Sequence, residues 1–126
     1  MPVQQPLALV LYEKLMPGSH LVNRLQDLKY RVTTISEVSL LVTKAEAEAP
    51  MLVLADLDFK GAGVGKAISH LRRNPSTAHI PVIAFADEGS ESLIADGQQS
   101  GATLVVTDSA VLAHLPQLLE QALHLE

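Results

Sequence analysis

Short apolar runs alternate with longer amphipathic stretches along the whole chain. Five segments have the length of a strand; the first is apolar without alternation, which is typical of a parallel strand buried on both faces, and the second is rich in β-branched residues. They cover residues 7–12, 30–35, 51–56, 80–85 and 104–106. Each run precedes a stretch of helical periodicity, of which Val64, Ile68 and Leu71 are one example. The alternation predicts five β-α units, and therefore an α/β fold built on a parallel sheet.

Prolines, glycines and hydroxyl residues predict where the first two helices begin and end. Pro17 and Gly18 indicate a turn, after which Ser19 is the expected cap of the first helix. Ser36 is the expected cap of the second helix, and Pro50 closes it.

Similar signals bound the later helices. The dipeptide Asn74-Pro75 ends the third helix. Asp108 or Ser109 is the expected cap of the last helix. Pro116 lies inside the apolar stripe of that helix, so it either kinks the helix or marks its true first turn.

Composition limits the function classes. A chain of 126 residues is one domain, and we expect it to span 1–126 with residues 1–6 as a loose N-terminal tail. The start has no signal-peptide pattern, no apolar run has the length of a membrane span, and there are no cysteines, so we expect a cytoplasmic protein. The formal charge is -5 and the cations are scattered, which disfavours direct nucleic-acid binding.

Polar residues follow several of the predicted strands. Ligands of an open parallel sheet bind beyond the C-terminal ends of its strands, so these residues mark the expected site. They are Tyr12 and Glu13, Asp56 and Asp58, Ala86 and Asp87, and Thr107 and Asp108.

Three blocks of sequence carry a family resemblance. "RRNPSTAHIPVIAF" (Arg72 to Phe85), "LVLADLD" (Leu52 to Asp58) and "SGATLVV" (Ser100 to Val106) occur in the order and at the spacing of a receiver domain. The chain thus resembles the CheY-like receiver domains of response regulators in two-component systems. That resemblance implies a flavodoxin-like three-layer α/β/α sandwich, with a five-stranded parallel sheet of order 2-1-3-4-5.

The resemblance also implies a phosphorylation site. Asp56 falls on the phosphoacceptor of the family, and Asp58 falls where a backbone carbonyl meets the Mg²⁺ ion. The acidic pair that completes the metal site corresponds to Tyr12-Glu13, so one of the two carboxylates is missing. The expected Mg²⁺ ligands, Glu13, Asp56 and Asp58, therefore form a weakened site.

Other family positions hold residues that lack the required chemistry. Ala86 replaces the hydroxyl residue that bonds the phosphoryl group, and a methyl group donates no hydrogen bond. The lysine of the family corresponds to Thr107 or Asp108, and neither is a cation. Its aromatic switch residue corresponds to Leu104 or Val105. These losses predict a degenerate receiver, or pseudo-receiver.

Two functional hypotheses follow. The first is a phosphorylation-independent binding module that is not an enzyme and needs no cofactor. It binds a kinase, an effector domain or a second copy of itself through its fourth and fifth helices and its fifth strand. A homodimer that forms through the last two helices is one version of this hypothesis. The second is an atypical receiver in which Glu13 and Asp56 bind Mg²⁺ and Asp56 accepts a phosphoryl group. Whether the chain stands alone or is part of a larger protein is open.

Other interpretations fit less well. Gly61 to Lys66 invites a nucleotide-binding reading, but it matches neither the Walker nor the dinucleotide pattern. The Asp-Leu-Asp of Asp56 to Asp58 lies on the third strand instead of the first, unlike the motif of aspartate-nucleophile phosphohydrolases. The five histidines have no metal-binding spacing. Arg72-Arg73 reads as the solvated end of the third helix.

Overall fold

A five-stranded parallel sheet forms the centre of the molecule. The computed structural model describes residues 6–12, 15–58 and 63–124. The strands are β1 (Leu7–Leu11), β2 (Arg31–Ile35), β3 (Leu52–Asp56), β4 (Val82–Ala86) and β5 (Leu104–Thr107). They run parallel in the order β2-β1-β3-β4-β5, which confirms the predicted order. β4 begins at Val82, two residues later than predicted, because Ile80 belongs to a preceding turn in which its N–H bonds the carbonyl of Thr77.

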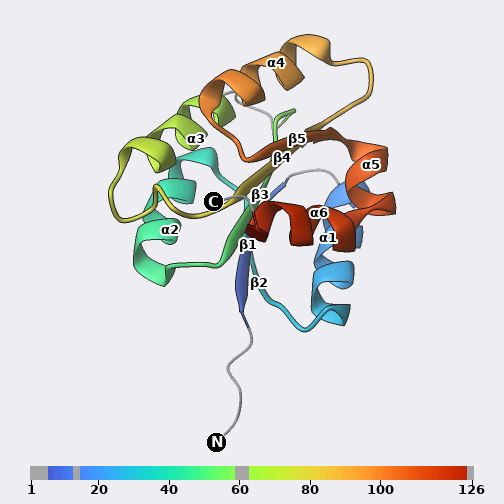
Figure 1. The fold of residues 1–126 in the computed structure, drawn as a ribbon, viewed down its shortest axis with the longest axis horizontal. Coiled ribbons are helices and arrows are strands. Elements are labelled where there is room, and N and C mark those ends of the chain that lie inside the picture. Colours follow the sequence, from blue (N-terminus) through green and yellow to red (C-terminus); the bar gives the residue numbers. More distant parts are fainter. Residues whose placement is uncertain (1–5, 13–14, 59–62, 125–126) are drawn as a thin grey trace, which may run out of the picture.

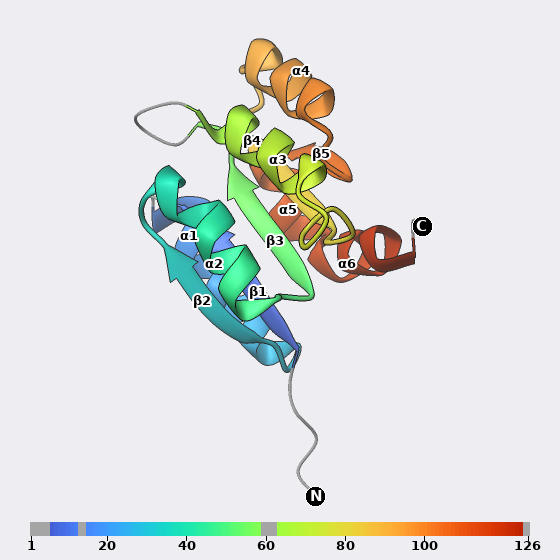
Figure 2. The same cartoon turned by 90° about the vertical axis from the view of Figure 1, so that its left-hand side faces the viewer.

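Helices cover both faces of the sheet. They are α1 (Leu15–Asp27), α2 (Leu41–Glu48), α3 (Val64–Arg73), α4 (Glu91–Ser100), α5 (Asp108–Ala113) and α6 (Leu115–His124), with a short 3₁₀ helix η1 (Val38–Leu40) before α2. Figures 1 and 2 show α2, α3 and α4 on one face and α1, α5 and α6 on the other. The arrangement is a three-layer α/β/α sandwich, as predicted.

Two apolar clusters, one on each face of the sheet, form the core. Successive residues of β3 point to opposite faces, so Val53 packs in the cluster that contains Ile68 and Leu71, whereas Leu54 packs in the one that contains Leu21. All residues of β1, β3 and β4 are buried. Burial on both sides is why these strands carry no polar alternation.

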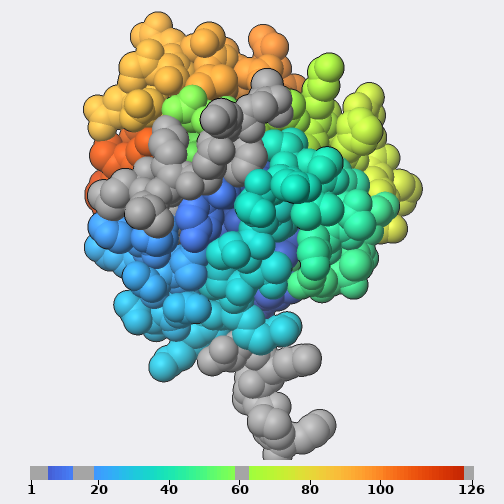
Figure 3. Space-filling model, turned by 180° about the vertical axis from the view of Figure 1, so that it is seen from behind, coloured from blue at the N-terminus to red at the C-terminus, as the bar shows by residue number. Residues whose placement is uncertain are grey.

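β5 differs from the three central strands. It pairs with β4 alone and lies at the edge of the sheet, and each of its four residues is half-buried. The molecule therefore leaves part of an apolar edge strand accessible between α4 and the last two helices. Figure 3 shows the molecule from behind, with α4 (orange) at the top, α2 (teal to green) lower down on the right, and the residues around β2 (cyan) near the bottom.

The predicted start of the first helix is wrong. α1 begins at Leu15, so Pro17 and Gly18 lie inside its first turn and Ser19 is not its cap. A proline is tolerated there because the first backbone N–H groups of a helix have no partner within the helix.

Two other predicted caps are also wrong. α2 follows η1, whose cap position is Glu37, and no side chain of Ser36 caps either helix. Thr107 caps α5 one residue before the predicted Asp108 or Ser109, because its Oγ1 accepts a hydrogen bond from the N–H of Ala110 at 3.2 Å. Pro116 lies in the first turn of α6, which confirms one of the two expectations for it.

Arg72 is not a solvated end of α3. Its guanidinium is partly buried and donates to the carbonyls of Gly101 (2.6 Å), Ala78 (2.8 Å) and Ile80 (2.8 Å). It also donates to Oγ1 of Thr103 at 2.6 Å. Burial lowers the pKa of this guanidinium from its ordinary value, but an arginine still remains charged. Arg72 thus joins α3 to the segments that lead into β4 and β5.

Across the described ranges, no helix combines the length and the apolar character that a bilayer span requires.

Candidate functional site

Asp56 lies at the C-terminal end of β3, where the sequence placed the phosphoacceptor. Its side chain is 1% exposed. Oδ1 accepts a hydrogen bond from the backbone N–H of Asp58 at 2.9 Å, a local turn that fixes the orientation of the carboxylate. Leu57, the residue between them, is buried in the cluster beneath α3 and α4. The position is that of an oriented, enclosed carboxylate at the edge where α/β proteins bind ligands.

Ala86 ends the neighbouring strand β4 and is 0% exposed. The Cα of Phe85 is in register with Asp56, and that of Ala86 with Thr107 on β5. The position predicted for a phosphoryl-binding hydroxyl is therefore occupied by a buried methyl group beside the edge of the sheet.

The hydroxyl of Thr107 is engaged at the start of α5. It accepts from the N–H of Ala110 and lies 3.4 Å from Oγ of Ser109. Ser109 in turn donates a hydrogen bond to the carboxylate of Glu88 in the β4–α4 loop. Together these contacts tie the β4–α4 loop to the N-terminal end of α5.

Asp108 is the first residue of α5 and is half-buried. An acidic residue in the first turn of a helix interacts favourably with the helix dipole. Whichever of Thr107 and Asp108 corresponds to the family lysine, the position contributes no positive charge.

The metal-binding prediction is met only in part by the described residues. Glu13 lies outside them, so its place in the site stays a prediction. Tyr12 supplies no carboxylate, and its ring packs against the cluster beneath α1, α5 and α6. Among the described residues, no three histidine or acidic side chains come together as a cation site. Of the expected Mg²⁺ ligands, Asp56 and the backbone of Asp58 remain, and this set is too small without Glu13.

The two candidate switch positions point to opposite faces of β5. Leu104 packs against the cluster beneath α1, α5 and α6, and Val105 against the cluster beneath α2, α3 and α4. Both are half-buried aliphatic side chains, so neither offers an aromatic ring that could turn between two positions.

The glycine-rich segment before α3 falls partly outside the described residues. Gly61 is among those not described, whereas Gly63 is the N-cap of α3 with φ +88°. Gly65 is buried within the helix. The nucleotide-binding alternative therefore gains no support from this segment.

Comparison with known proteins gives structural matches only: neither a protein-family model nor a curated protein matches the sequence. A response regulator from Chloroflexus aurantiacus superimposes with a TM-score of 0.86 at 16% identity, over 95% of this chain and 98% of that one. The chemotaxis protein CheY4 of Vibrio cholerae gives 0.81 at 17% identity, over 94% and 99%. The receiver domain of NtrX from Brucella abortus gives 0.81 at 16% identity, also over 94% and 99%. This chain has the receiver-domain fold.

The receiver fold explains why the candidate residues meet at one edge. In a doubly wound sheet of order 2-1-3-4-5, the ends of β1, β3 and β4 converge at the point where the strand order reverses. The fold brings Asp56 and Ala86 onto adjacent strand ends, as predicted. At such low identity the likeness establishes the fold, and the chemistry of the site has to be argued from its residues.

Two parts of the surface could not be predicted from the sequence. One is the contact between Glu88 and Ser109, which are 21 positions apart and lie in no known motif. The other is the groove between α3 and α4, whose residues, among them Lys66, Arg73 and Asp96, resemble ordinary surface positions in sequence.

Proposed function

We propose that this chain is a receiver-like signalling domain of a two-component system that acts by docking another protein, without being phosphorylated. The observation that carries the proposal is Ala86, a fully buried methyl group at the strand end where a phosphoryl-binding hydroxyl is expected. A phosphoaspartate formed at Asp56 would lack the hydrogen bond through which the β4–α4 loop senses it.

The contacts around the β4–α4 loop support this proposal. The nearest strand-end hydroxyl, that of Thr107, is used to cap α5. Ser109 donates a hydrogen bond to Glu88, so side chains of the protein hold the loop against α5. A loop that is already held by protein groups needs no new anion to order it.

The docking face that we propose consists of α4, β5 and α5. β5 lies in the middle of this face and at the edge of the sheet, and it is half-exposed. β1, β3 and β4, in contrast, are buried along their whole length. A partly exposed apolar edge suits burial against a partner. The partner is a protein, either a kinase, an effector domain or a second copy of the chain. Light scattering distinguishes a second copy from the other two.

Incubation with acetyl phosphate and Mg²⁺, followed by intact-mass measurement, tests the proposal. We expect no phosphoryl adduct on the wild-type chain, while a phosphorylatable receiver treated in parallel gains one. An adduct that appears on the wild type and is absent from Asp56→Asn would overturn the proposal.

That second outcome would support the rival function, an atypical phosphorylatable receiver. The observation in its favour is Asp56 itself, which lies at the end of β3 with a carboxylate oriented by the N–H of Asp58. In that function Asp56 is the nucleophile, and Glu13, Asp56 and the backbone carbonyl of Asp58 would hold Mg²⁺, which neutralises the transferred group. It requires Asp56→Asn to abolish both phosphoryl incorporation and signalling.

A further inference from the structure

α3 has a charge unlike that of the other described helices. Its ten residues include Lys66, Arg72 and Arg73 and no aspartate or glutamate, so its formal charge is +3 in a chain whose net charge is -5. α2 and α4 each carry more acidic than basic residues. A concentration of positive charge on one helix of an acidic protein creates a local field of opposite sign.

Two of these cations and a histidine share one exposed face. Arg72 points inward to its carbonyl partners, whereas Lys66, His70 and Arg73 are exposed. Their spacing of four and then three residues places them in a row along the helix. At about 1.5 Å per residue, Lys66 and Arg73 are about 10 Å apart along the helix axis.

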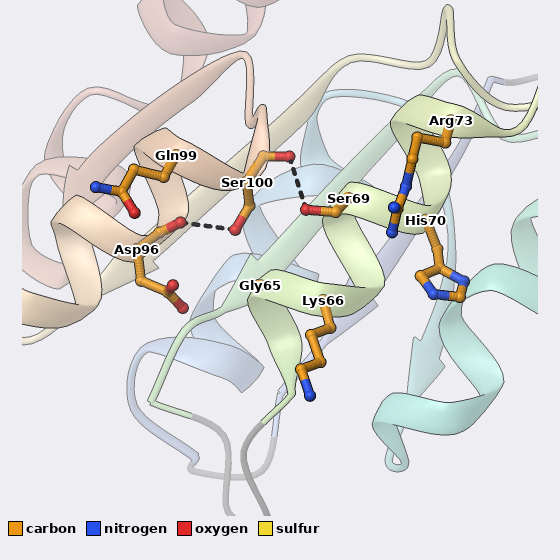
Figure 4. A pocket seen from close by; sticks show the side chains of 8 residues that line it. All are labelled: Gly65, Lys66, Ser69, His70, Arg73, Asp96, Gln99 and Ser100. Carbon is orange, nitrogen blue, oxygen red and sulfur yellow. Dashed lines mark hydrogen bonds between the residues drawn. The ribbon is translucent and has the colours of Figure 1, made fainter.

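This row borders a groove between α3 and α4 (Figure 4). The groove has a volume of about 390 Å³, and Gly65, Lys66, Ser69, His70, Arg73, Asp96, Gln99 and Ser100 line it. A second hollow of about 370 Å³ lies on the other side of the row, where His70 and Arg73 meet Val42 and Asn74. The basic row is thus a ridge with a depression on each flank.

Gly65 shapes the floor of the groove. A Cβ at this position would lie 2.6 Å from Oδ2 of Asp96 and 2.7 Å from Oγ of Ser100, so the glycine lets α4 approach α3 closely. Ser69 donates to the carbonyl of Ser100 at 3.3 Å, which joins the two helices along the floor.

The walls of the groove differ in charge. Lys66, His70 and Arg73 form the α3 wall, and Asp96 faces Gly65 from the α4 wall (Figure 4). Gln99 on α4 adds a neutral amide. An anionic ligand that meets the basic ridge is therefore attracted by α3 and repelled by Asp96, the α4 carboxylate that lines the groove.

We propose that this ridge and groove dock an acidic helical segment of a partner protein, with carboxylates two helical turns apart that meet Lys66 and Arg73. The separation of the two cations along the helix favours such a segment over a single small anion, which cannot contact both. The ridge has only two cations, Lys66 and Arg73, which are too few for the many phosphate contacts that nucleic-acid binding requires. The cations that carry the inference, Lys66 and Arg73, belong to α3, which is not part of the docking face proposed above, whereas the other wall of the groove is formed by α4, which is part of that face.

A peptide titration followed by ¹H–¹⁵N NMR tests the inference on the full chain. The probe is a synthetic helical peptide with three glutamates spaced four and three residues apart, and the matched peptide has glutamine at those positions. We expect the glutamate peptide to shift the amide signals of α3 and the adjoining end of α4, and the glutamine peptide to leave them in place. Absence of these shifts overturns the proposal.

Charge variants give effects of opposite sign. The double variant Lys66→Glu, Arg73→Glu should lower the affinity for the glutamate peptide by at least about tenfold, because attraction becomes repulsion. Asp96→Asn should raise that affinity by about twofold to fivefold, because the opposing carboxylate is removed. Arg24→Glu changes an exposed cation on α1, on the other face of the sheet, and should leave the affinity unchanged. An equal loss in Arg24→Glu would show a response to net charge and overturn the proposal.

Three further outcomes would also contradict it. The same shifts produced by inorganic phosphate would indicate a small-anion site. Shifts produced by a single-stranded oligonucleotide at equal affinity would indicate nucleic acid. Shifts that appear on concentrating the protein alone would indicate that a second copy of the chain fills the groove.

Discussion

Two adjacent arginines have different roles at the end of α3. Arg72 is enclosed and donates to three carbonyls and to Thr103, whereas Arg73 is exposed on the proposed docking ridge. Thr103 also accepts from the N–H of Val82 at 3.0 Å, so the two side chains together hold the starts of β4 and β5. The pair is a structural anchor and a surface cation side by side.

Removal of the anchor is expected to cost stability. Arg72→Ala deletes several charge-assisted hydrogen bonds and leaves their acceptors to be rehydrated, so we expect the free energy of unfolding to fall by about 2–4 kcal/mol. Arg73→Ala is the matched control and should change it by less than about 0.5 kcal/mol. Urea titration followed by circular dichroism measures both. Equal losses in the two variants would contradict the assignment of Arg72 as an anchor.

Local sequence does not distinguish these two residues. Both are arginines in the last turn of a predicted helix, where a cation is favoured by the dipole whether it is exposed or buried. The partners of Arg72 lie six to 31 residues further along the chain, and the fold brings them within reach by placing the segments that precede β4 and β5 beside the end of α3. The positions of Asp56 and Ala86, in contrast, could be predicted from local sequence, because a strand pattern and a motif were sufficient to assign each residue to the end of a strand.

At the scale of the element, the existence of strands and helices was easier to predict than their ends. Buried parallel strands leave an uninterrupted apolar run, which identified β1, β3 and β4, whereas β2 is partly exposed and was identified by its β-branched residues. A helix end depends on which backbone N–H a side chain reaches. Thr107 occupies that position before α5, although Asp108 and Ser109 are equally good capping residues by type.

The assignment of Thr107 as the cap makes a testable prediction. Thr107→Ala removes the acceptor for the N–H of Ala110 and should lower the free energy of unfolding by about 1 kcal/mol. Ser109→Ala removes an exposed hydrogen bond to Glu88 and should lower the free energy of unfolding by less than about 0.5 kcal/mol. Thermal and urea unfolding compare the two variants. A larger loss for Ser109→Ala would restore the cap predicted from the sequence.

Gly101 ends α4 in a left-handed conformation, with φ +99°. An added Cβ there would also lie 2.9 Å from Cγ of Arg72, so Gly101→Ala combines backbone strain with a close contact. We expect a loss of about 1–2 kcal/mol in the free energy of unfolding.

Gly89→Ala provides the control for this glycine. Gly89 has no heavy atom within 4 Å of the position of an added Cβ and does not have a positive φ. Its substitution should leave the urea midpoint nearly unchanged. If Gly101→Ala were equally neutral, the left-handed cap of α4 would be wrong.

At the scale of the whole molecule, a complete receiver fold surrounds an altered strand-end site. The sheet order and the three layers agree with the prediction, and the described part of the site has a carboxylate on β3 beside a methyl group on β4. The fold depends on apolar volume and period, which tolerate many sequences, whereas phosphorylation depends on a few charged and hydroxyl groups. This is why the fold follows from the pattern and the activity depends on single residues.

The most direct test of the account is the response of the wild-type chain to Mg²⁺ and beryllofluoride, a mimic of the phosphoryl group on aspartate. We predict that the ¹H–¹⁵N spectrum stays unchanged at Asp56, Asp58 and residues 86–89, because Ala86 and the three residues after it have no hydroxyl to offer the mimic. A new set of signals for these residues, absent without Mg²⁺ and lost in Asp56→Asn, would contradict it.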